Sequence, residues 1–463
     1  MFVGREKELT ALNNLYQSDR FEFAVIYGRR RIGKTALISQ FTKEKDTIFF
    51  TGVETNEKQN LENFSRCIME YQTGMAVPTS FLNFQSALEY VFELSRKKRM
   101  VLVIDEYPYV AHASKSLAST LQFLIDKEKD HSKLFLILCG SSMSYMEDHV
   151  LAYKAPLYGR RTAQFKIKPF DFFESCRYFK NLSSFDKAAA YGIVGGTPQY
   201  LGLIDDTLSI EENIKKIYLD PSSFIYEEPG NLLKQEVREP SIYNAVITSI
   251  AAGASRINEI SQKIDENTSV CATYIKNLIA LGILKKESPY GEKSKRKTVY
   301  SIEDNMFRFW YRFIPENISA ISRGAQELAY KRIAPELSSY MGSVYEEICG
   351  QYLWKLLLEG RCAVDFNDIG RWWGTNPKTR TQEEIDIMGT DGDKALFGEC
   401  KWTNEKVDAA VLKTLAERSL LFYYQKKYFY LFSKTGFTQG CMDEAAKMGN
   451  VTLVTYEDIL KEA

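Results

Sequence analysis

The stretch FEFAVIYGRRRIGKTALISQF, residues 21–41, decides the fold of the N-terminal part of the chain. An apolar run of strand length leads into the pattern GxxxxGK(S/T), and a helical pattern begins near its lysine. Glycines let backbone amides approach phosphates closely, the lysine can reach the terminal phosphates, and the threonine hydroxyl can bind magnesium. The helix adds the positive end of its dipole. The stretch therefore predicts a nucleotide-binding P-loop that comprises Gly28, Gly33, Lys34, Thr35 and Ala36.

Two further apolar runs predict neighbouring strands of a parallel sheet. KKRMVLVIDEYPYV, residues 97–110, ends its apolar part in Asp105 and Glu106. An aspartate there is placed to hold the magnesium shell, and the adjacent glutamate can polarise a water for attack on the γ-phosphate. The run KLFLILCGSS, residues 133–142, ends in Ser141 and Ser142. A serine at this position can sense the γ-phosphate, or the pair simply ends the strand in a turn.

Two later segments fit the same site. APLYGRRT, residues 155–162, carries Arg160 and Arg161. Either arginine can supply positive charge to the transition state, in its own chain or in a neighbouring one. The alternative is a solvated basic loop. GIVGGTPQYL, residues 192–201, places glycines and a proline between helical segments, which indicates a lid turn near the nucleotide or only a helix break.

Six segments in this order resemble the archaeal-type ATPase family over about residues 1–230: FVGREKEL, YGRRRIGKT, LVIDEYPY, CGSS, PLYGR and GGTPQYL. Its members are P-loop ATPases of the additional-strand class. The resemblance implies ATP and Mg²⁺ as ligands. It also implies that Arg5 packs beside the nucleotide base and that Arg160 is the candidate arginine finger.

Length and composition set the outer limits. At about 150 residues per domain, 463 residues predict roughly three domains. Lysine plus arginine equals aspartate plus glutamate, 60 each, so nucleic-acid affinity would need a local patch. The cysteines are scattered without a CxxC pair, which predicts buried thiols rather than a zinc site. No apolar run has membrane-spanning length and no signal segment begins the chain, so we expect a soluble cytoplasmic protein.

The middle of the chain, residues 236–314, predicts a winged helix-turn-helix. Amphipathic segments at 241–254, 256–265 and 268–284 precede a strand, a basic turn and a strand at 285–302. Such folds contact DNA through the third helix and the hairpin. The hairpin offers a basic patch, and the third helix offers few polar residues for base edges, so the alternative is a packing module between domains. The patch is Lys293, Lys295, Arg296 and Lys297, and the helix residues are Thr273, Lys276 and Asn277.

The stretch EIDIMGTDGDKALFGECKW, residues 384–402, predicts a hairpin that turns at Asp391-Gly392. In that register Asp386 is the diagonal neighbour of Glu399, and Lys401 shares their face. A strand aspartate followed by Glu-x-Lys is the pattern of PD-(D/E)xK nucleases: Asp386 and Glu399 would bind magnesium, and Lys401 would position water or stabilise charge. Glu346 or Glu347, on a preceding predicted helix, would complete the ligands. The alternative is a charged surface hairpin.

GRWWG, EEIDIM and GECKW resemble the domain of unknown function that commonly follows archaeal-type ATPases and is itself similar to the PD-(D/E)xK fold. This resemblance covers about residues 315–463. We therefore expect an α/β P-loop ATPase with a helical lid over 1–235, a winged helix over 236–314 and a restriction-endonuclease-like domain over 315–463. An ATP-regulated, Mg²⁺-dependent DNA nuclease is the first hypothesis. A signalling or assembly switch that binds nucleic acid or protein without cleavage is the second, and an ATP-driven loader that oligomerises through the arginine loop is the third.

Overall fold

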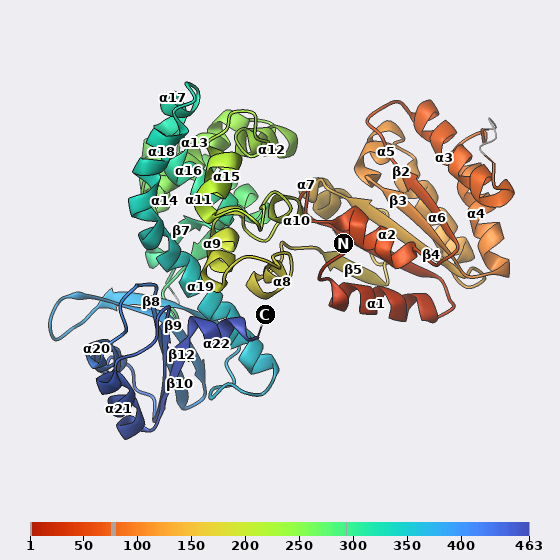
Figure 1. The fold of residues 1–463 in the computed structure, drawn as a ribbon. Coiled ribbons are helices and arrows are strands. Elements are labelled where there is room, and N and C mark those ends of the chain that lie inside the picture. The colour runs from red at the N-terminus through yellow and green to blue at the C-terminus, as the bar shows by residue number, and fades with distance from the viewer. Residues whose placement is uncertain (1, 76–79, 293, 463) are drawn as a thin grey trace. The chain divides into compact units, whose positions relative to one another are not determined.

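A computed structural model describes residues 2–75, 80–292 and 294–462 (Figure 1). The chain divides into two compact units. The first comprises Met1–Pro169 with Thr197–Gln199, and the second comprises Phe170–Gly196 with Tyr200–Ala463. The separate boundary predicted at residue 315, within the second unit, stays a prediction.

A parallel sheet forms the centre of the first unit. Its strands are β1 (Glu22–Tyr27), β2 (Thr47–Thr51), β3 (Met100–Asp105), β4 (Leu134–Gly140) and β5 (Ala163–Lys166), in the order β2-β3-β4-β1-β5. Strand β4 thus lies between the strand that enters the P-loop and the strand that ends in Asp105. This inserted strand confirms the predicted additional-strand class.

Helices cover both faces of this sheet, and β1, β3 and β4 are therefore buried along their whole length. Leu12 and Phe41, from the helices on one face, share a core cluster with alternate strand residues such as Ala24. On the other face Phe64 packs against Phe50, with ring centroids 5.1 Å apart. The helices of the unit are α1 (Glu6–Gln17), α2 (Lys34–Thr42), α3 (Glu57–Thr73), α4 (Phe84–Lys97), α5 (Tyr107–Ala113), α6 (Leu117–Glu128), α7 (Met143–Tyr145) and the π-helical turn η1 (Met146–Leu151).

The second unit begins with a helical part. Its helices are α8 (Phe172–Cys176), α9 (Ser184–Val194), α11 (Ile210–Tyr218), α12 (Glu228–Glu236), α13 (Pro240–Ala251), α14 (Ile257–Lys263) and α15 (Thr268–Ala280), and α10 (Pro198–Leu201) spans the junction with the first unit. An antiparallel hairpin of β6 (Leu284–Glu287) and β7 (Val299–Ile302) follows, with the turn η2 (Lys295–Lys297) between its strands. Helix α16 (Asn305–Phe313) comes next, and its Phe307 and Phe309 are buried.

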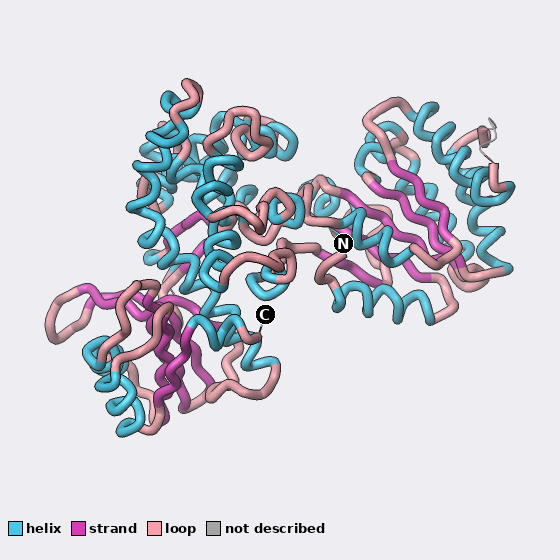
Figure 2. The backbone as a smooth tube through the Cα atoms, in the orientation of Figure 1, coloured by secondary structure: helices cyan, strands magenta, loops and turns pink. Residues whose placement is uncertain are grey.

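A mixed sheet ends the second unit (Figure 2). Strands β8 (Ile369–Thr375), β9 (Gln382–Asp391) and β10 (Lys394–Lys401) are antiparallel, and β11 (Lys426–Ser433) and β12 (Val451–Thr455) continue parallel to β10. Phe397 packs with Leu412 and Cys441 from the helices on one face. Between α16 and this sheet the chain forms the turn η3 (Pro315–Asn317), the helices α17 (Ile318–Ile321) and α18 (Gln326–Ile333), the turn η4 (Ala334–Glu336) and the helix α19 (Leu337–Leu358). The helices α20 (Ala409–Ser419), α21 (Gln439–Met448) and α22 (Tyr456–Leu460) each follow a strand of the sheet.

The register of β9 corrects the sequence prediction at two places. Asp391 pairs with Lys394, so the turn is Gly392-Asp393 rather than Asp391-Gly392. Gly392 there has a φ of 55°, which glycine adopts without strain. Further along, Gly370 of β8 pairs with Met388 and Trp372 pairs with Ile385.

Two residues of β9 therefore face the single residue Arg371 of β8, which is a β-bulge. These two residues are Ile387 and Asp386. The predicted diagonal pairing of Asp386 with Glu399 is wrong, because in the register of β9 with β10 Phe397 pairs with Met388 rather than with Asp386. Instead, the Cys400 amide donates a hydrogen bond of 2.8 Å to the Asp386 carboxylate. The bulge places Asp386, the aspartate that the motif singles out, opposite Arg371 of β8.

Candidate functional site

The P-loop joins β1 to α2 as the sequence predicted. The Lys34 ammonium donates hydrogen bonds to the carbonyl oxygens of Gly28, at 2.8 Å, and Arg29, at 3.0 Å. A side chain at Gly28 would collide with the Ile167 carbonyl, and Gly33 has a φ of 86° at the start of α2. Both glycines are therefore required by the loop's own geometry, before any ligand is considered.

Thr35 and Asp105 form the pair that the sequence assigned to magnesium. The Thr35 hydroxyl donates a hydrogen bond of 2.8 Å to Oδ2 of Asp105, and the Glu106 amide donates one of 3.0 Å to Oδ1. Magnesium prefers oxygen ligands and keeps several waters, so a hydroxyl and a carboxylate side by side next to a phosphate loop fit this ion. These two residues would hold it.

Glu106 and Ser141 lie together at the ends of β3 and β4. The Ser141 hydroxyl donates to Oε2 of Glu106 at 2.8 Å, and its amide donates to the same oxygen at 3.3 Å. Glu106 itself has a φ of 50°, a strained conformation for a residue with a Cβ. Ser142 instead precedes α7 at its N-cap. The structure thus brings together the proposed catalytic glutamate and one of the two candidate sensor serines.

Arg5 fixes the P-loop from the N-terminal side. Its guanidinium is buried and donates to the carbonyl oxygens of Ile32, at 3.2 Å, and Lys168, at 2.5 Å. Arg29 of the loop donates to the Thr197 hydroxyl at 3.1 Å. Pro198 lies 3.6 Å from the position that a Cβ of Gly33 would take. The predicted lid turn at Gly195, Gly196 and Pro198 therefore runs on to the P-loop through Thr197 and Pro198, whereas contact with a nucleotide stays a prediction.

Arg160 is held by an ion pair within its own unit. Its guanidinium makes a two-pronged contact with Asp126 of α6, at 2.9 and 2.7 Å. The hydrogen bonds and charge of Asp126 raise the pKa of Arg160 above its ordinary value. Arg161 instead lies 5.7 Å from the ring centroid of Tyr158. In this conformation Arg160 is engaged with α6, and its role as an arginine finger stays a prediction.

The second candidate site is a group of carboxylates around the β9 bulge. Burial, followed by the negative charges of Glu399 and Glu346, raises the pKa of Asp386 from 3.8 to about 7. Burial also raises the pKa of Glu346; the positive charges of Arg371 and Lys285 oppose this rise, and the negative charges of Glu384 and Glu399 add to it. Three carboxylates from α19, β9 and β10 thus repel one another in a half-buried setting. Mutual repulsion of this kind is relieved by a cation.

Lys401 and Arg418 supply positive charge to the same group. The Lys401 ammonium lies 2.7 Å from Oε1 of Glu399, and the Arg418 guanidinium lies 3.4 Å from Oε2. Burial alone would lower the pKa of Lys401, but the charge and hydrogen bond of Glu399, together with Asp386, raise it. Over the part of the chain that the structure describes, no three His, Cys, Asp or Glu side chains are arranged as metal ligands. The negative charge of Glu399 therefore acts on Asp386, but the two side chains are not arranged as ligands of one metal ion.

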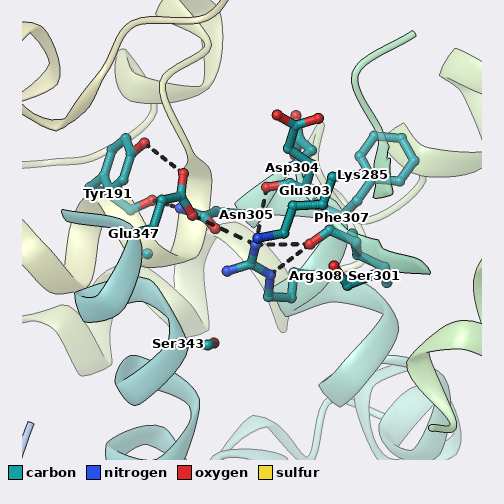
Figure 3. A network of polar contacts seen from close by, with 12 residues as sticks. Tyr191, Lys285, Ser301, Glu303, Asp304, Asn305, Phe307, Arg308, Ser343 and Glu347 are labelled. Atoms are coloured by element: carbon teal, nitrogen blue, oxygen red, sulfur yellow. Dashed lines mark hydrogen bonds and ion pairs between the residues drawn. The ribbon is translucent and has the colours of Figure 1, made fainter. Parts of the chain in front are cut away.

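Glu346 and Glu347 have different polar partners, although both line the same cavity. Both lie in the middle of α19. Glu346 faces the carboxylate group described above. Glu347 accepts a hydrogen bond of 3.3 Å from the Tyr191 hydroxyl and forms an ion pair of 3.7 Å with Arg308, as Figure 3 shows. Glu346 is thus the one of the two that meets the carboxylate group, and its role as a metal ligand stays a prediction.

Sequence reasoning missed Arg371, Arg418 and Lys285. Arg371 lies opposite the bulge and pairs with Glu384 at 2.8 Å. Arg418 lies on α20, and Lys285 lies on the hairpin strand β6. A cavity of about 510 Å³ brings Lys285 and Arg371 to the same walls as Glu346 and Asp386. No local pattern marks these residues, because they meet only through tertiary packing.

Some of the residues predicted to contact DNA from the basic hairpin and the third helix are engaged in contacts within the chain. Arg296 and Lys297 are exposed, and Lys297 pairs with Glu292 at 3.2 Å. Lys293 lies outside the described residues. The candidate base-reading residues Thr273, Lys276 and Asn277 are all exposed, and Asn277 donates a hydrogen bond of 2.6 Å to the Tyr243 hydroxyl.

Two expectations about the whole chain concern its thiols and its helices. Every cysteine is a free thiol, and most are buried. Among the described residues, no helix has both the length and the apolar character needed to cross a membrane.

The inserted β4 strand, the P-loop and the acidic pair at the end of β3 define a P-loop ATPase domain. Residues 2–204 match a family model described as an ATPase domain predominantly from Archaea, and residues 310–412 match one described as archaeal and bacterial proteins of unknown function. The chain belongs to this family of archaeal-type ATPases. It is 34% identical over 411 residues, 88% of each chain, to an uncharacterized protein of Methanocaldococcus jannaschii.

Two other relatives agree with this assignment. An uncharacterized ATP-binding protein of the same organism is 42% identical over 45 residues, which are 10% of this chain and 76% of that protein. Among solved structures, a Walker-type ATPase of Pyrococcus abyssi superposes with a TM-score of 0.52 at 17% identity, covering 67% of this chain and 96% of that one. At that identity the likeness concerns the fold alone.

Proposed function

We propose that the protein hydrolyses ATP and couples its nucleotide state to a Mg²⁺-dependent nuclease-like centre in its C-terminal domain. The ATPase half rests on the contacts of the P-loop. Lys34 would neutralise the terminal phosphates, Thr35 and Asp105 would hold Mg²⁺, and Glu106 would polarise the attacking water. Ser141 would orient Glu106 through the hydrogen bonds described above.

The observation that carries the nuclease-like half is the convergence of Glu346 and Asp386 on the wall of one cavity, with Glu399 and Lys401 paired at 2.7 Å on the neighbouring strand β10. Bound Mg²⁺ would supply an activated water and stabilise charge at a phosphorus atom. Asp386, Glu399 and Glu346 would be its ligands. Lys401 pairs with Glu399 in this structure. If the Glu399 carboxylate bound a cation instead, the Lys401 ammonium would be released to face the scissile phosphate.

A continuous set of contacts supports coupling between the two sites. Arg29 of the P-loop holds Thr197, and Thr197 follows closely on the end of α9. Tyr191 of α9 bonds to Glu347, which is the neighbour in sequence of the candidate ligand Glu346 (Figure 3). A shift of the lid turn on nucleotide binding would therefore reach α19 through Tyr191. The hairpin of β6 and β7 after three helices supports a winged helix, through which DNA would be a partner.

A specific observation favours a second candidate function, a switch that binds nucleic acid or a protein partner without cleavage. Both oxygens of Glu399 are engaged, one by Lys401 and one by Arg418. If these ion pairs persist in the presence of divalent cations, Glu399 cannot be a ligand. The C-terminal domain would then be a binding surface under nucleotide control. ATP-dependent self-association through Arg160 would be the mark of a loader.

The deciding experiment is cleavage of plasmid, linear and single-stranded DNA with Mg²⁺ or Mn²⁺. It is run without nucleotide, with ATP and with a non-hydrolysable analogue, beside the variants Lys401→Ala and Lys34→Ala. We expect the parent to cleave DNA and Lys401→Ala not to cleave it. In Lys34→Ala, cleavage should no longer depend on nucleotide. ATP hydrolysis without cleavage under any of these conditions would select the switch.

A further inference from the structure

The cavity of about 510 Å³ is built from elements that the sequence assigned to different domains. The hairpin strands β6 and β7, the helix α19 and the strands β8 and β9 all line it. Its volume is in the range of ligand-binding pockets. Asp386 and Glu346 stand on its wall, whereas Glu399 and Lys401 do not line it.

The hairpin is fastened over this cavity by Tyr290. The Tyr290 amide donates to the Arg371 carbonyl at 2.9 Å, and its hydroxyl lies 3.0 Å from the Thr390 hydroxyl. The Thr390 amide donates back to the Tyr290 hydroxyl at 3.1 Å. The loop of the hairpin is thus tied to both β8 and β9, and the hairpin strands form one wall of the cavity.

The charges in the cavity are balanced only without a metal ion. Among the described lining residues, the cations and the carboxylates are equal in number. The cations are Lys285, Arg308, Arg312 and Arg371, and the carboxylates are Glu287, Glu346, Glu347 and Asp386. A divalent cation held by Asp386 and Glu346 would therefore give the cavity a net positive charge. Such a cavity favours an anion that bridges the metal and the remaining cations.

The geometry points to the phosphodiester backbone of a single nucleic-acid strand as this anion, with Lys285 and Arg371 as its phosphate contacts. This inference rests on the proposed function. A sphere of the cavity's volume is about 10 Å across, and a B-DNA duplex is wider than its ~12 Å major groove alone. One strand fits such a space, and a duplex does not.

Two positively charged side chains are placed to hold the phosphates. The Lys285 ammonium forms an ion pair of 3.0 Å with Glu287. Because an ammonium has three donors, it can contact a phosphate at the same time. Arg371 faces the bulge that carries Asp386 and offers a planar fork suited to phosphate. The Tyr300 ring also lines the cavity and offers a face on which a base can stack. Figure 3 shows Lys285 and Ser301 from the hairpin beside Arg308.

The test uses the full chain and a short fluorescein-labelled oligonucleotide, as a single strand and as a blunt duplex. Binding is measured by anisotropy over a salt series, in EDTA and in Ca²⁺. Lys286 is a matched control for Lys285, because it is the next residue of β6, is exposed and does not line the cavity.

We expect tighter binding of the single strand than of the duplex, and tighter binding in Ca²⁺ than in EDTA. Lys285→Ala should weaken binding about tenfold and reduce the slope of log K against log salt by about 0.7, the value for one lost phosphate contact with a single strand. Lys286→Ala should change neither quantity, and Lys285→Arg should restore both.

Equal losses in Lys285→Ala and Lys286→Ala, or a loss confined to the exposed hairpin residue Arg296→Ala, would overturn the inference, because nucleic acid would then meet the outside of the hairpin. Tighter binding of the duplex, or no binding of either probe, would overturn it as well. The proposed nuclease activity is tested separately. Binding that depends on Lys285, without cleavage in Mg²⁺, would support the cavity site and refute the nuclease. Cleavage that does not change in Lys285→Ala would support the nuclease and refute the cavity site.

Discussion

Replacing Asp386 by asparagine is expected to stabilise the folded chain at neutral and alkaline pH. The pKa of Asp386 is raised from 3.8 to about 7 by burial and by the charges of Glu399 and Glu346. Between these two values the folded chain keeps a proton that the unfolded chain releases. The free energy of unfolding therefore falls by ~1.4 kcal/mol for each pH unit in this window as pH rises.

Over the whole window this loss reaches about 4 kcal/mol. That figure is an upper bound, because Glu346, whose pKa burial also raises, can take up the proton instead. Asparagine carries no charge and can still accept the hydrogen bond from the Cys400 amide. Hence Asp386→Asn should match the parent near pH 4 and exceed it near pH 8 by several degrees in melting temperature, at ~2–4 °C per kcal/mol.

The assay is differential scanning calorimetry of the full chain over this pH range, without divalent cations. Asp391→Asn is the matched control, since Asp391 is an exposed residue at the end of the same strand. Mg²⁺ at a hundred times its Kd should add about 2.7 kcal/mol to the parent at high pH and much less to Asp386→Asn. Identical pH profiles for parent and Asp386→Asn would refute the picture of three carboxylates in mutual repulsion.

Three further substitutions test other parts of the structure. Lys34→Ala should abolish measurable phosphate release from ATP while leaving the melting temperature without nucleotide nearly unchanged. Arg160→Ala should lower ATP turnover by ~10³-fold or more, with ATP affinity retained, if Arg160 is an arginine finger; a turnover equal to that of the parent would leave it only its ion pair with Asp126. Gly196→Ala should cost about 1–3 kcal/mol in stability, because the added Cβ overlaps the Phe170 carbonyl, whereas Gly230→Ala in open space should cost nothing.

The nucleotide site was predictable because its parts are local. The P-loop, the acidic end of β3 and the serine end of β4 each follow a buried apolar strand, and parallel strands bring such ends to one edge of a sheet. The sequence named Thr35 and Asp105, and the structure places them in hydrogen-bond contact. What the sequence lacked was the partner of Ser141, since its contact with Glu106 depends on strand order.

The carboxylate site was only partly predictable, for three physical reasons. The turn moved by one residue because Gly392, not Asp391, took the left-handed first position. The bulge at Asp386 arises from pairing with β8, which no pattern within β9 announces. Glu346 and Glu347 are adjacent on a helix and point about 100° apart, so only tertiary contacts decide which one meets Asp386.

The three hydrogen bonds of Tyr290 have a practical consequence for anyone who dissects this protein. A fragment that begins at residue 315 would lose the ring that packs beside Trp372 and Ile385 and would lose the lid of the cavity. Its freshly bared apolar surface would invite aggregation, and a negative result from it would say nothing about the intact molecule. A fragment intended to fold on its own should therefore contain both the hairpin and the last sheet.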